Sequence, residues 1–364
     1  MGGIHHRAYI GYERWDVDAL RRKSSKITIK DVASHANVSL GTVSRVLNGN
    51  ATVNRDIAHR VSAAIVDLGF TPNAAARSMR SNTTRTVAFI VSDISNPLYA
   101  RIVKSAEQVL NEKGYFVLVG STGHSHEREL KLISLLRTGR VDASLLAISD
   151  ESDPAIVEAI GESEVPIVLL DREMALPLDS VLSDHRSGMR KAVAHLWQLN
   201  HRRIALIAGG EKERPGRERL AGFLEGHRAL GAEADPKLTR SGNMSEEFGF
   251  QETYDLLMQA EPPTAIIAGS NRLLAGAIRA IRQLKVRIPD DISLIGCDDT
   301  DLSNLLDPPV TVISRDMDAI GRAAGLTLLR RLSDPSGLAP TKVLLPTDFI
   351  VRESCVDLGA PRQA

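Results

Sequence analysis

The 364-residue sequence has little cysteine, few aromatic residues and no long apolar stretch. Its two cysteines, Cys297 and Cys355, belong to no paired motif, as expected in a reducing cytoplasm. No apolar run approaches the roughly 20 residues of a membrane span, and the start lacks the apolar core of a signal peptide. We therefore expect a cytoplasmic protein with no membrane partner.

Motifs of common catalytic and metal sites are absent too, including the dinucleotide-binding, phosphate-loop, nucleophile-elbow and zinc-protease patterns. The closest approach to a metal cluster, His124 to Glu127, falls where a loop enters a helix, which is typical of a hydrated surface. The acidic run 298–301 lacks the glycine and distal glutamate of a calcium loop. We predict no catalytic residue, no metal site and no cofactor.

The formal net charge of zero hides a strong asymmetry along the chain. Residues 1–86 contain 13 Lys and Arg against 6 Asp and Glu, so the remaining residues contain 32 against 39. A basic head on an acidic body is expected when one end of a protein faces phosphates.

Residues 27–48 have the pattern of two short helices joined by a tight turn. Thr28 is a good N-cap, Asn37 interrupts the first helix, and Ser39 caps a second helix that begins at Leu40. This is a helix-turn-helix pattern. The second helix has an apolar side of Val43, Val46 and Leu47 and an outward side of Leu40, Gly41, Ser44, Arg45 and Asn48.

A third helix is predicted from an Asn54 cap to a stop at Gly69. Three such helices could instead bind a protein, but the basic charge favours DNA. Residues 1–26 show no periodicity and include a basic run at 21–26, which we interpret as a mobile tail. Extra phosphate contacts, or a start assigned too early, are the alternatives.

From Thr86 onward, short apolar runs alternate with amphipathic segments. Continuous apolar strands separated by helices indicate parallel sheets that are covered on both faces. The units are too many for one ordinary sheet, so two doubly wound lobes are expected. Strands are predicted at 87–91, 115–119, 143–147, 167–170, 204–208, 265–268 and 292–295, and helices near 98–112 and 126–138.

Four stretches carry a resemblance to a known family: IKDVA at 29–33, VS at 38–39, TVSRVLN at 42–48 and PNAAARSM at 72–79. They resemble the head and hinge of the lactose-repressor/galactose-repressor (LacI/GalR) family of bacterial transcription factors, and the order of elements agrees to about residue 355. The resemblance implies a small all-α helix-turn-helix headpiece. It also implies an α/β periplasmic-binding-protein-like body of two doubly wound parallel-sheet lobes.

The chain is then expected to cross between the lobes near residues 183, 314 and 341. The implied organisation is an N-terminal extension at 1–26, a headpiece at 27–72, a hinge and linker at 73–85, an N-terminal lobe at 86–183 and 314–341, a C-terminal lobe at 184–313 and 342–356, and a tail at 357–364.

In the headpiece we expect Arg45 to contact a base, most simply guanine, through its two-pronged guanidinium. Leu40 would touch a thymine methyl group, and Gly41 offers no side chain to read with. In the resembling family the hinge wedges a leucine into the minor groove, a place that Met79 takes here. The residues expected to position the DNA backbone are Thr28, Ser39, Thr42, Ser44 and Asn48.

In the body, polar residues that follow the strands are candidates for ligand contact, because open parallel sheets bind ligands at that edge. The resemblance assigns the polar clamp on the effector to Arg219 and Asp298. The alternatives are a carboxylate that caps the next helix and an arginine on a solvated face. The expected effector-binding set is Leu98, Tyr99, Asp171, Arg219, Met244, Ser270, Asn271 and Asp298.

Two departures from the family pattern bear on the ligand. Met244 stands where sugar- or purine-binding members tend to place an aromatic residue, and the usual Asn-Asp pair appears as Ser270 and Asn271. These departures, with an aromatic content of only 4%, argue against stacking on a sugar.

We therefore expect a homodimeric transcription regulator, a repressor, that binds an inverted-repeat operator in double-stranded DNA. A sugar or other polar metabolite in the cleft would switch it. The alternative is a ligand-binding module, or an unrecognised α/β enzyme, with a vestigial headpiece.

The hinge supplies a prediction, because a helix of one or two turns is unstable alone and gains order only when docked. Met79→Gly should weaken operator binding severely and flatten the effector response, while effector binding to the body stays intact. The amides of residues 75–80 should exchange freely in the unbound dimer and become protected on the operator. Protection without DNA would contradict this order–disorder mechanism.

Overall fold

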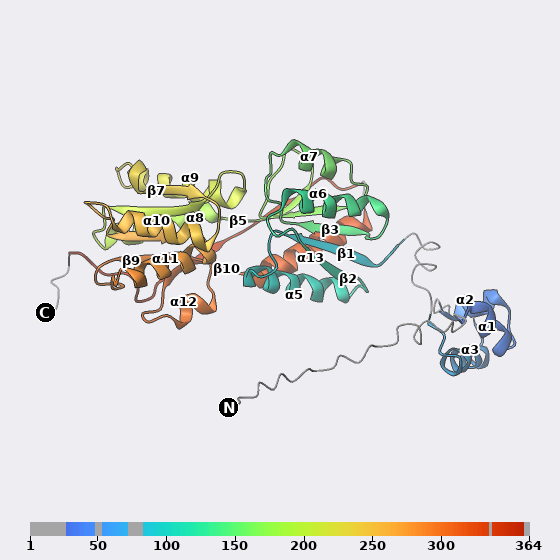
Figure 1. The fold of residues 1–364 in the computed structure, drawn as a ribbon. Helices are drawn as coiled ribbons and strands as arrows, with labels where there is room; N and C mark the ends of the chain where they lie inside the picture. Colours follow the sequence, from blue (N-terminus) through green and yellow to red (C-terminus); the bar gives the residue numbers. More distant parts are fainter. Residues whose placement is uncertain (1–26, 48–52, 72–82, 335–336, 360–364) are drawn as a thin grey trace, which may run out of the picture. The chain divides into compact units, whose positions relative to one another are not determined.

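The computed structural model describes residues 27–47, 53–71, 83–334 and 337–359 (Figure 1). The chain divides into two compact units, residues 1–82 and residues 83–364. The described part of the first unit is helical, and the second unit contains two sheets covered by helices.

The headpiece consists of α1 (Ile29–His35), α2 (Leu40–Leu47) and α3 (Arg55–Asp67). The Thr28 amide and hydroxyl both donate to Asp31 Oδ2 at 2.7 Å, which closes a capping box at the start of α1. Asn37 has a φ of 51°, a left-handed conformation that asparagine tolerates, and so turns the chain between the two helices. The predicted helix-turn-helix is confirmed. Its small core is formed by Val32, Ala33, Ala36, Val43, Val61 and Ala64.

The first lobe of the body is built on a parallel sheet with the strand order β11-β5-β4-β3-β1-β2. Helices α5 and α13 share one apolar cluster with this sheet, and α6 and α7 share the other. The strands are β1 (Thr86–Val91), β2 (Phe116–Ser121), β3 (Ala143–Leu146), β4 (Ile167–Leu170), β5 (Asp179–Ser183) and β11 (Lys342–Leu345). The helices are α5 (Pro97–Asn111), α6 (His126–Ser134), the 3-10 turn η1 (Leu135–Thr138), α7 (Pro154–Gly161) and α13 (Met317–Ser333).

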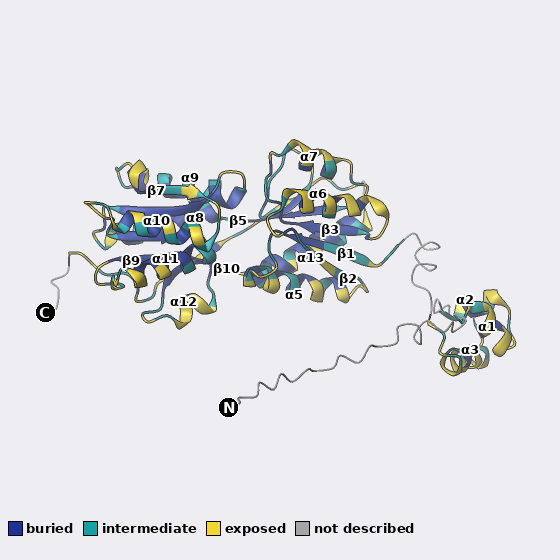
Figure 2. Cartoon of the chain, viewed as in Figure 1, coloured by how far each residue is buried: buried dark blue, intermediate teal, exposed yellow. Residues whose placement is uncertain are grey.

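The second lobe has the strand order β12-β10-β9-β8-β6-β7, parallel except for β12 against β10. Figure 2 shows its strands buried between helices whose outer faces are exposed. The strands are β6 (Ile204–Gly209), β7 (Thr239–Gly242), β8 (Ala265–Ala268), β9 (Ser293–Cys297), β10 (Thr311–Arg315) and β12 (Thr347–Ile350). The helices are α8 (His185–Gln198), α9 (Arg214–Ala229), the 3-10 turn η2 (Pro236–Leu238), α10 (Glu246–Leu257), α11 (Asn271–Gln283) and α12 (Asp301–Leu305). The predicted fold class is confirmed.

The lobe boundaries differ from the expected ones in two places. Strand β10 continues to Arg315, so residues 314 and 315 belong to the second lobe and not to the first. Strand β11 pairs with β5 in the first sheet, so residues 342–345 belong to the first lobe and not to the second. Val343 and Leu345 pack against the apolar cluster of that lobe, which explains the placement.

The start of the body is fixed by Asp142, which follows η1. Its Oδ1 accepts hydrogen bonds from the Thr84 amide and hydroxyl, both at 2.7 Å, and its Oδ2 accepts one from the Arg85 amide at 2.8 Å. The Thr83 hydroxyl also donates to this carboxylate. Burial acts to raise the pKa of Asp142, but these hydrogen bonds hold it below its ordinary value of 3.8.

Asp142→Ala should lower the free energy of unfolding of the body by about 1–3 kcal/mol near neutral pH, because the hydrogen bonds from Thr84 and Arg85 to an ionised acceptor are lost. A depressed pKa stabilises the fold above the unfolded-state value, so the difference should shrink as the pH falls through and below 3.8. Urea unfolding of the full chain measures both effects. Asp348→Ala is the control, since that side chain is exposed; equal stability of the two variants would contradict the assignment.

Candidate functional site

The outward side of α2 is the candidate DNA-reading surface of the headpiece. Ser39, Leu40, Gly41 and Arg45 are exposed, whereas Val43 is fully buried. Leu40 is 43% exposed and so can contact a partner of the headpiece. This surface therefore offers an apolar group and a cation next to each other.

Position 41 on α2 lies beside the Arg45 guanidinium and could hold a small side chain as well as glycine. A Cβ atom at Gly41 would lie 3.8 Å from Arg45 Nη2, in ordinary contact with it. Arg45 forms no hydrogen bond or ion pair within the described ranges of the headpiece. Its donors are thus free for a base edge or a phosphate.

The other residues that are expected to contact DNA differ in burial and in the hydrogen bonds that they already form. Ser39 Oγ accepts a hydrogen bond from the Thr42 amide at 3.2 Å and so caps α2, and it also lies 2.9 Å from Thr42 Oγ1. The Thr28 hydroxyl already donates to Asp31 in the capping box of α1, and Ser44 is half-buried. Asn48 and Met79 lie outside the described residues.

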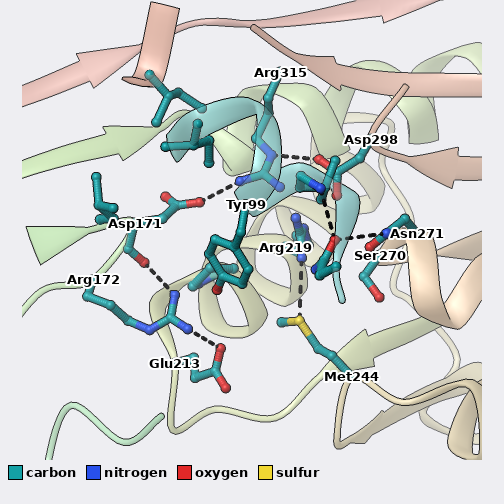
Figure 3. Close-up of a pocket in the computed structure, with 16 residues that line it drawn as sticks. Tyr99, Asp171, Arg172, Glu213, Arg219, Met244, Ser270, Asn271, Asp298 and Arg315 are labelled. Carbon is teal, nitrogen blue, oxygen red and sulfur yellow. Dashed lines mark hydrogen bonds and ion pairs between the residues drawn. The ribbon is translucent and has the colours of Figure 1, made fainter. Parts of the chain in front are cut away.

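The body contains a cavity between its two lobes, at the carboxyl ends of strands from both sheets (Figure 3). Its volume is about 80 Å³, less than the roughly 300–1,000 Å³ of common ligand sites. The cleft must widen before it can hold a metabolite. All eight residues predicted for the effector line it: Leu98, Tyr99, Asp171, Arg219, Met244, Ser270, Asn271 and Asp298.

Arg219, on the first turns of α9, is only 3% exposed, which excludes a solvated position. Its Nη1 lies 4.0 Å from the Met244 sulfur, and its Nε has no hydrogen-bond partner in the part of the chain that the structure describes. A buried guanidinium without acceptors is costly unless something else supplies them. The side chain points into the cavity (Figure 3).

Asp171 and Asp298 occupy equivalent places in the two lobes, each directly after a strand. Their φ angles are 51° and 75°, in the left-handed region that strains residues other than glycine. Neither carboxylate caps a following helix: Asp171 Oδ1 accepts from the Ser183 amide at 3.0 Å, and the N-cap of α12 is Thr300. The strained turns direct both carboxylates toward the cleft (Figure 3).

Arg315, at the end of β10, connects these two carboxylates. Its Nε donates to Asp298 Oδ1 at 2.7 Å, and its Nη1 donates to Asp171 Oδ2 at 2.8 Å (Figure 3). Asp298 Oδ2 is buried and has no hydrogen-bond partner among the described residues. One acceptor of this carboxylate therefore remains free beside Arg219.

Protonation states in the cleft follow from these contacts. Burial lowers the pKa of His185 to about 4, although Asp171 acts to raise it, so the imidazole is neutral at pH 7. It lies 2.7 Å from Asp171 Oδ2 through Nε2. Burial acts to raise the pKa of Asp171, but His185 and Arg315 hold it well below its usual range. Asp171 is thus ionised, and His185 donates to it.

Side chains on both rims of the cleft join the lobes. On one rim Arg172 Nη2 donates to Glu213 Oε2 at 2.6 Å, from the first lobe to the loop before α9. On the other, Asn271 Nδ2 donates to Asn96 Oδ1 at 3.1 Å. Arg272 also pairs with Asp93. Opening the lobes must break these contacts.

Several lining residues were not predicted from the sequence. Arg172 directly follows Asp171, so the rule for strand ends could have found it. Arg315 was missed because residues 311–315 were not recognised as a strand. The other unpredicted lining residues are Asn96, Ile102, Leu170, Glu213, Pro215 and Ile320.

Comparison with known proteins agrees with this architecture. The model of the family described as "Bacterial regulatory proteins, lacI family" matches residues 28–73, and that of a "Periplasmic binding protein-like domain" matches residues 193–355. The transcriptional regulator DegA of Bacillus subtilis is 33% identical over 341 residues, which cover 92% of this chain and 99% of DegA. The chain belongs to the lacI family of bacterial regulatory proteins.

Solved structures of LacI-family proteins resemble this regulator over nearly its whole length. The lac repressor dimer bound to operator and an anti-inducer has a TM-score of 0.80 and 28% identity, covering 91% of this chain and all of that one. The regulator CelR in complex with cellobiose has a TM-score of 0.70 and 31% identity, covering 90% and 99%. Family membership supports a DNA-binding role for the three-helix head over a protein-binding one.

Within the described ranges, this LacI-family regulator has no helix that is both long and apolar enough to cross a membrane.

Proposed function

We propose that this LacI-family regulator represses transcription by binding an inverted-repeat operator as a homodimer in the bacterial cytoplasm. A small polar effector in the cleft of the body switches it. The observation that carries this proposal is the cavity between the lobes, where the buried atoms Arg219 Nε and Asp298 Oδ2 have no hydrogen-bond partner among the described residues. Such groups are the usual means by which a pocket recognises a polar ligand.

The effector acts through the distance between the lobes. Asp171 and Tyr99 belong to the first lobe, and Arg219 and Asp298 to the second, so a ligand that contacts both lobes favours one spacing over others. A ligand shifts an equilibrium only by its difference in affinity for the two states. Contacts to both lobes supply that difference.

The headpiece reads the operator through the outward side of α2. Arg45 supplies the bidentate donors that fit guanine and Leu40 the apolar contact to a thymine methyl, while Gly41 offers no side chain to read with. Ser39, Thr42, Ser44, Asn48 and Thr28 fix the register on the backbone, and Met79 wedges into the minor groove.

Arg45→Ala should cost about 1–3 kcal/mol of binding free energy on an operator selected in vitro, and little on random DNA of equal length. Arg45→Lys is the matched control: it keeps the charge but loses the two-pronged geometry, so it should retain non-specific affinity and lose discrimination. Fluorescence anisotropy titrations at fixed salt measure both. Equal losses on the two DNAs would make Arg45 a phosphate contact.

Arg219→Met and Asp298→Asn should each abolish the effect of the identified effector on operator affinity, because the ligand loses its clamp. Operator affinity without effector should stay nearly unchanged. Arg228→Met is the matched control, since Arg228 lies on the same helix with an exposed side chain. The assignment of the cleft would be wrong if both cleft variants responded to effector like the unsubstituted protein.

A further inference from the structure

Helix α9, which carries Arg219 of the cleft, lacks a side-chain cap from its own lobe. Its N-cap residue is Glu213, whose side chain forms no hydrogen bond with the first amides of the helix and instead pairs with Arg172 of the first lobe. No acidic residue lies in the first turn, which begins and ends with Arg214 and Arg217. Cations are unfavourable at the positive end of a helix, where anions are stabilising. The start of α9 therefore needs an acceptor from elsewhere.

The other long helices of the same lobe show what α9 is missing. Asp184, Ser245 and Ser270 each accept a hydrogen bond from a first-turn amide, in α8, α10 and α11 respectively. Loss of such a cap shifts the equilibrium between the capped and uncapped forms by roughly 2- to 30-fold. Of these four helices, α9 is thus the one whose cap does not precede it directly in the sequence.

The missing acceptor comes from the first lobe. Glu151, in the loop between β3 and α7, accepts a hydrogen bond through Oε1 from the Arg214 amide at 2.6 Å. Its Oε2 pairs with the Arg217 guanidinium, and its own amide donates to the Lys212 carbonyl oxygen at 3.1 Å. Glu151 is only 6% exposed. A buried carboxylate of one lobe thus caps a helix of the other and pairs with one of its arginines.

The loop that carries Glu151 is anchored within the first lobe. Glu129 of α6 is buried and accepts hydrogen bonds from the Ser149 hydroxyl and, at 2.9 Å, from the Ser149 amide. Asp150 Oδ1 accepts from the Ser152 amide at 3.0 Å. Because all these bonds stay within the first lobe, the loop moves with that lobe. Widening the cleft on this rim therefore withdraws Glu151 from α9.

We propose that Glu151 is a positioning residue, an interlobe cap of α9 that favours the narrow cleft when no effector is bound. This inference rests on the proposed function of the cleft. Pro215 and Arg219, on the first turns of α9, line the cavity, whereas Glu151 does not. Glu151 therefore acts on the effector site through α9. Separation of the lobes uncaps the helix that carries these two side chains and leaves a buried carboxylate without its partners, which is unfavourable.

A second ion pair between the same two loops provides a matched control. Lys212 Nζ lies 3.1 Å from Asp150 Oδ2, but the lysine side chain is 78% exposed. Exposed pairs of this kind contribute little to stability. Lys212→Met removes this interlobe pair and leaves the Lys212 carbonyl oxygen and the cap of α9 in place.

Residue-resolved amide hydrogen exchange of the full-length protein without ligand tests the proposal. The amide of residue 151 is the reporter, because its bond to the Lys212 carbonyl oxygen joins the lobes and does not depend on the side chain at 151. After correction for intrinsic rates, Glu151→Ala should speed exchange of this amide and of residues 216–219 by roughly 2- to 30-fold. Glu151→Gln should have a smaller effect, since its side-chain oxygen still accepts from the Arg214 amide, and Lys212→Met should have almost none.

A double-variant cycle separates an interlobe cap from a defect within the loop. Arg217→Met alone should speed exchange at residue 151 less than Glu151→Ala does, because the Arg214 amide stays capped. In the Glu151→Ala background it should add almost nothing, because its partner is already gone. The proposal is overturned if Glu151→Ala leaves exchange unchanged, if the acceleration stays within residues 149–153, or if the two substitutions act additively.

Operator binding by the same samples distinguishes failure of this inference from failure of the proposed function. If the unsubstituted protein binds an operator selected in vitro but Glu151→Ala does not change exchange, the proposed function stands and the interlobe cap is wrong. If exchange responds as expected but the protein binds no specific operator, the cap is present and the proposed function fails.

Discussion

The ion pairs of Arg315 are the contact on which the rest of the body depends. This side chain extends from the end of β10, where the chain leaves the second lobe, and binds Asp298 of that lobe and Asp171 of the first. Ion pairs buried to this degree stabilise a structure only when their geometry satisfies most donors and acceptors. Here the network is nearly satisfied, and its unmatched groups, Arg219 and one oxygen of Asp298, face the cavity. The lobes are therefore held together by the same charges that a ligand must engage.

This arrangement gives the cleft two competing sets of contacts. The rim pairs, such as Arg172 with Glu213 and Asn271 with Asn96, favour closed lobes without a ligand. A ligand that fills the cavity must first widen it and then supply contacts of its own. An effector shifts the equilibrium between the two spacings by the difference in its affinity for them. At the other end of the first lobe, Asp142 fixes residues 83–85, so a change in lobe position moves the point from which the linker starts.

Much of this architecture could be predicted from the sequence, because it depends on local signals. Caps at Thr28 and Asn54 define the helices of the head, and apolar runs define the buried strands. The rule for strand ends placed Asp171 and Asp298 at one cleft. The ion pairs between side chains could not be predicted. Nothing in the sequence indicates that Arg315 binds Asp298, because that contact joins residues 17 apart across two strands. The same holds for β11, whose apolar residues fit either sheet until tertiary packing selects the first.

We propose that effector and operator shift the same conformational equilibrium of the dimer. Each ligand must then change the affinity of the protein for the other, and this reciprocal change is the most direct test. The affinity of the full-length dimer for its identified effector should be measured by titration without DNA and with saturating operator. Thermodynamic linkage requires that operator change the effector Kd by the same factor by which effector changes the operator Kd. The account predicts equal factors, of roughly 5- to 150-fold. An effector Kd that is unchanged by operator would contradict it.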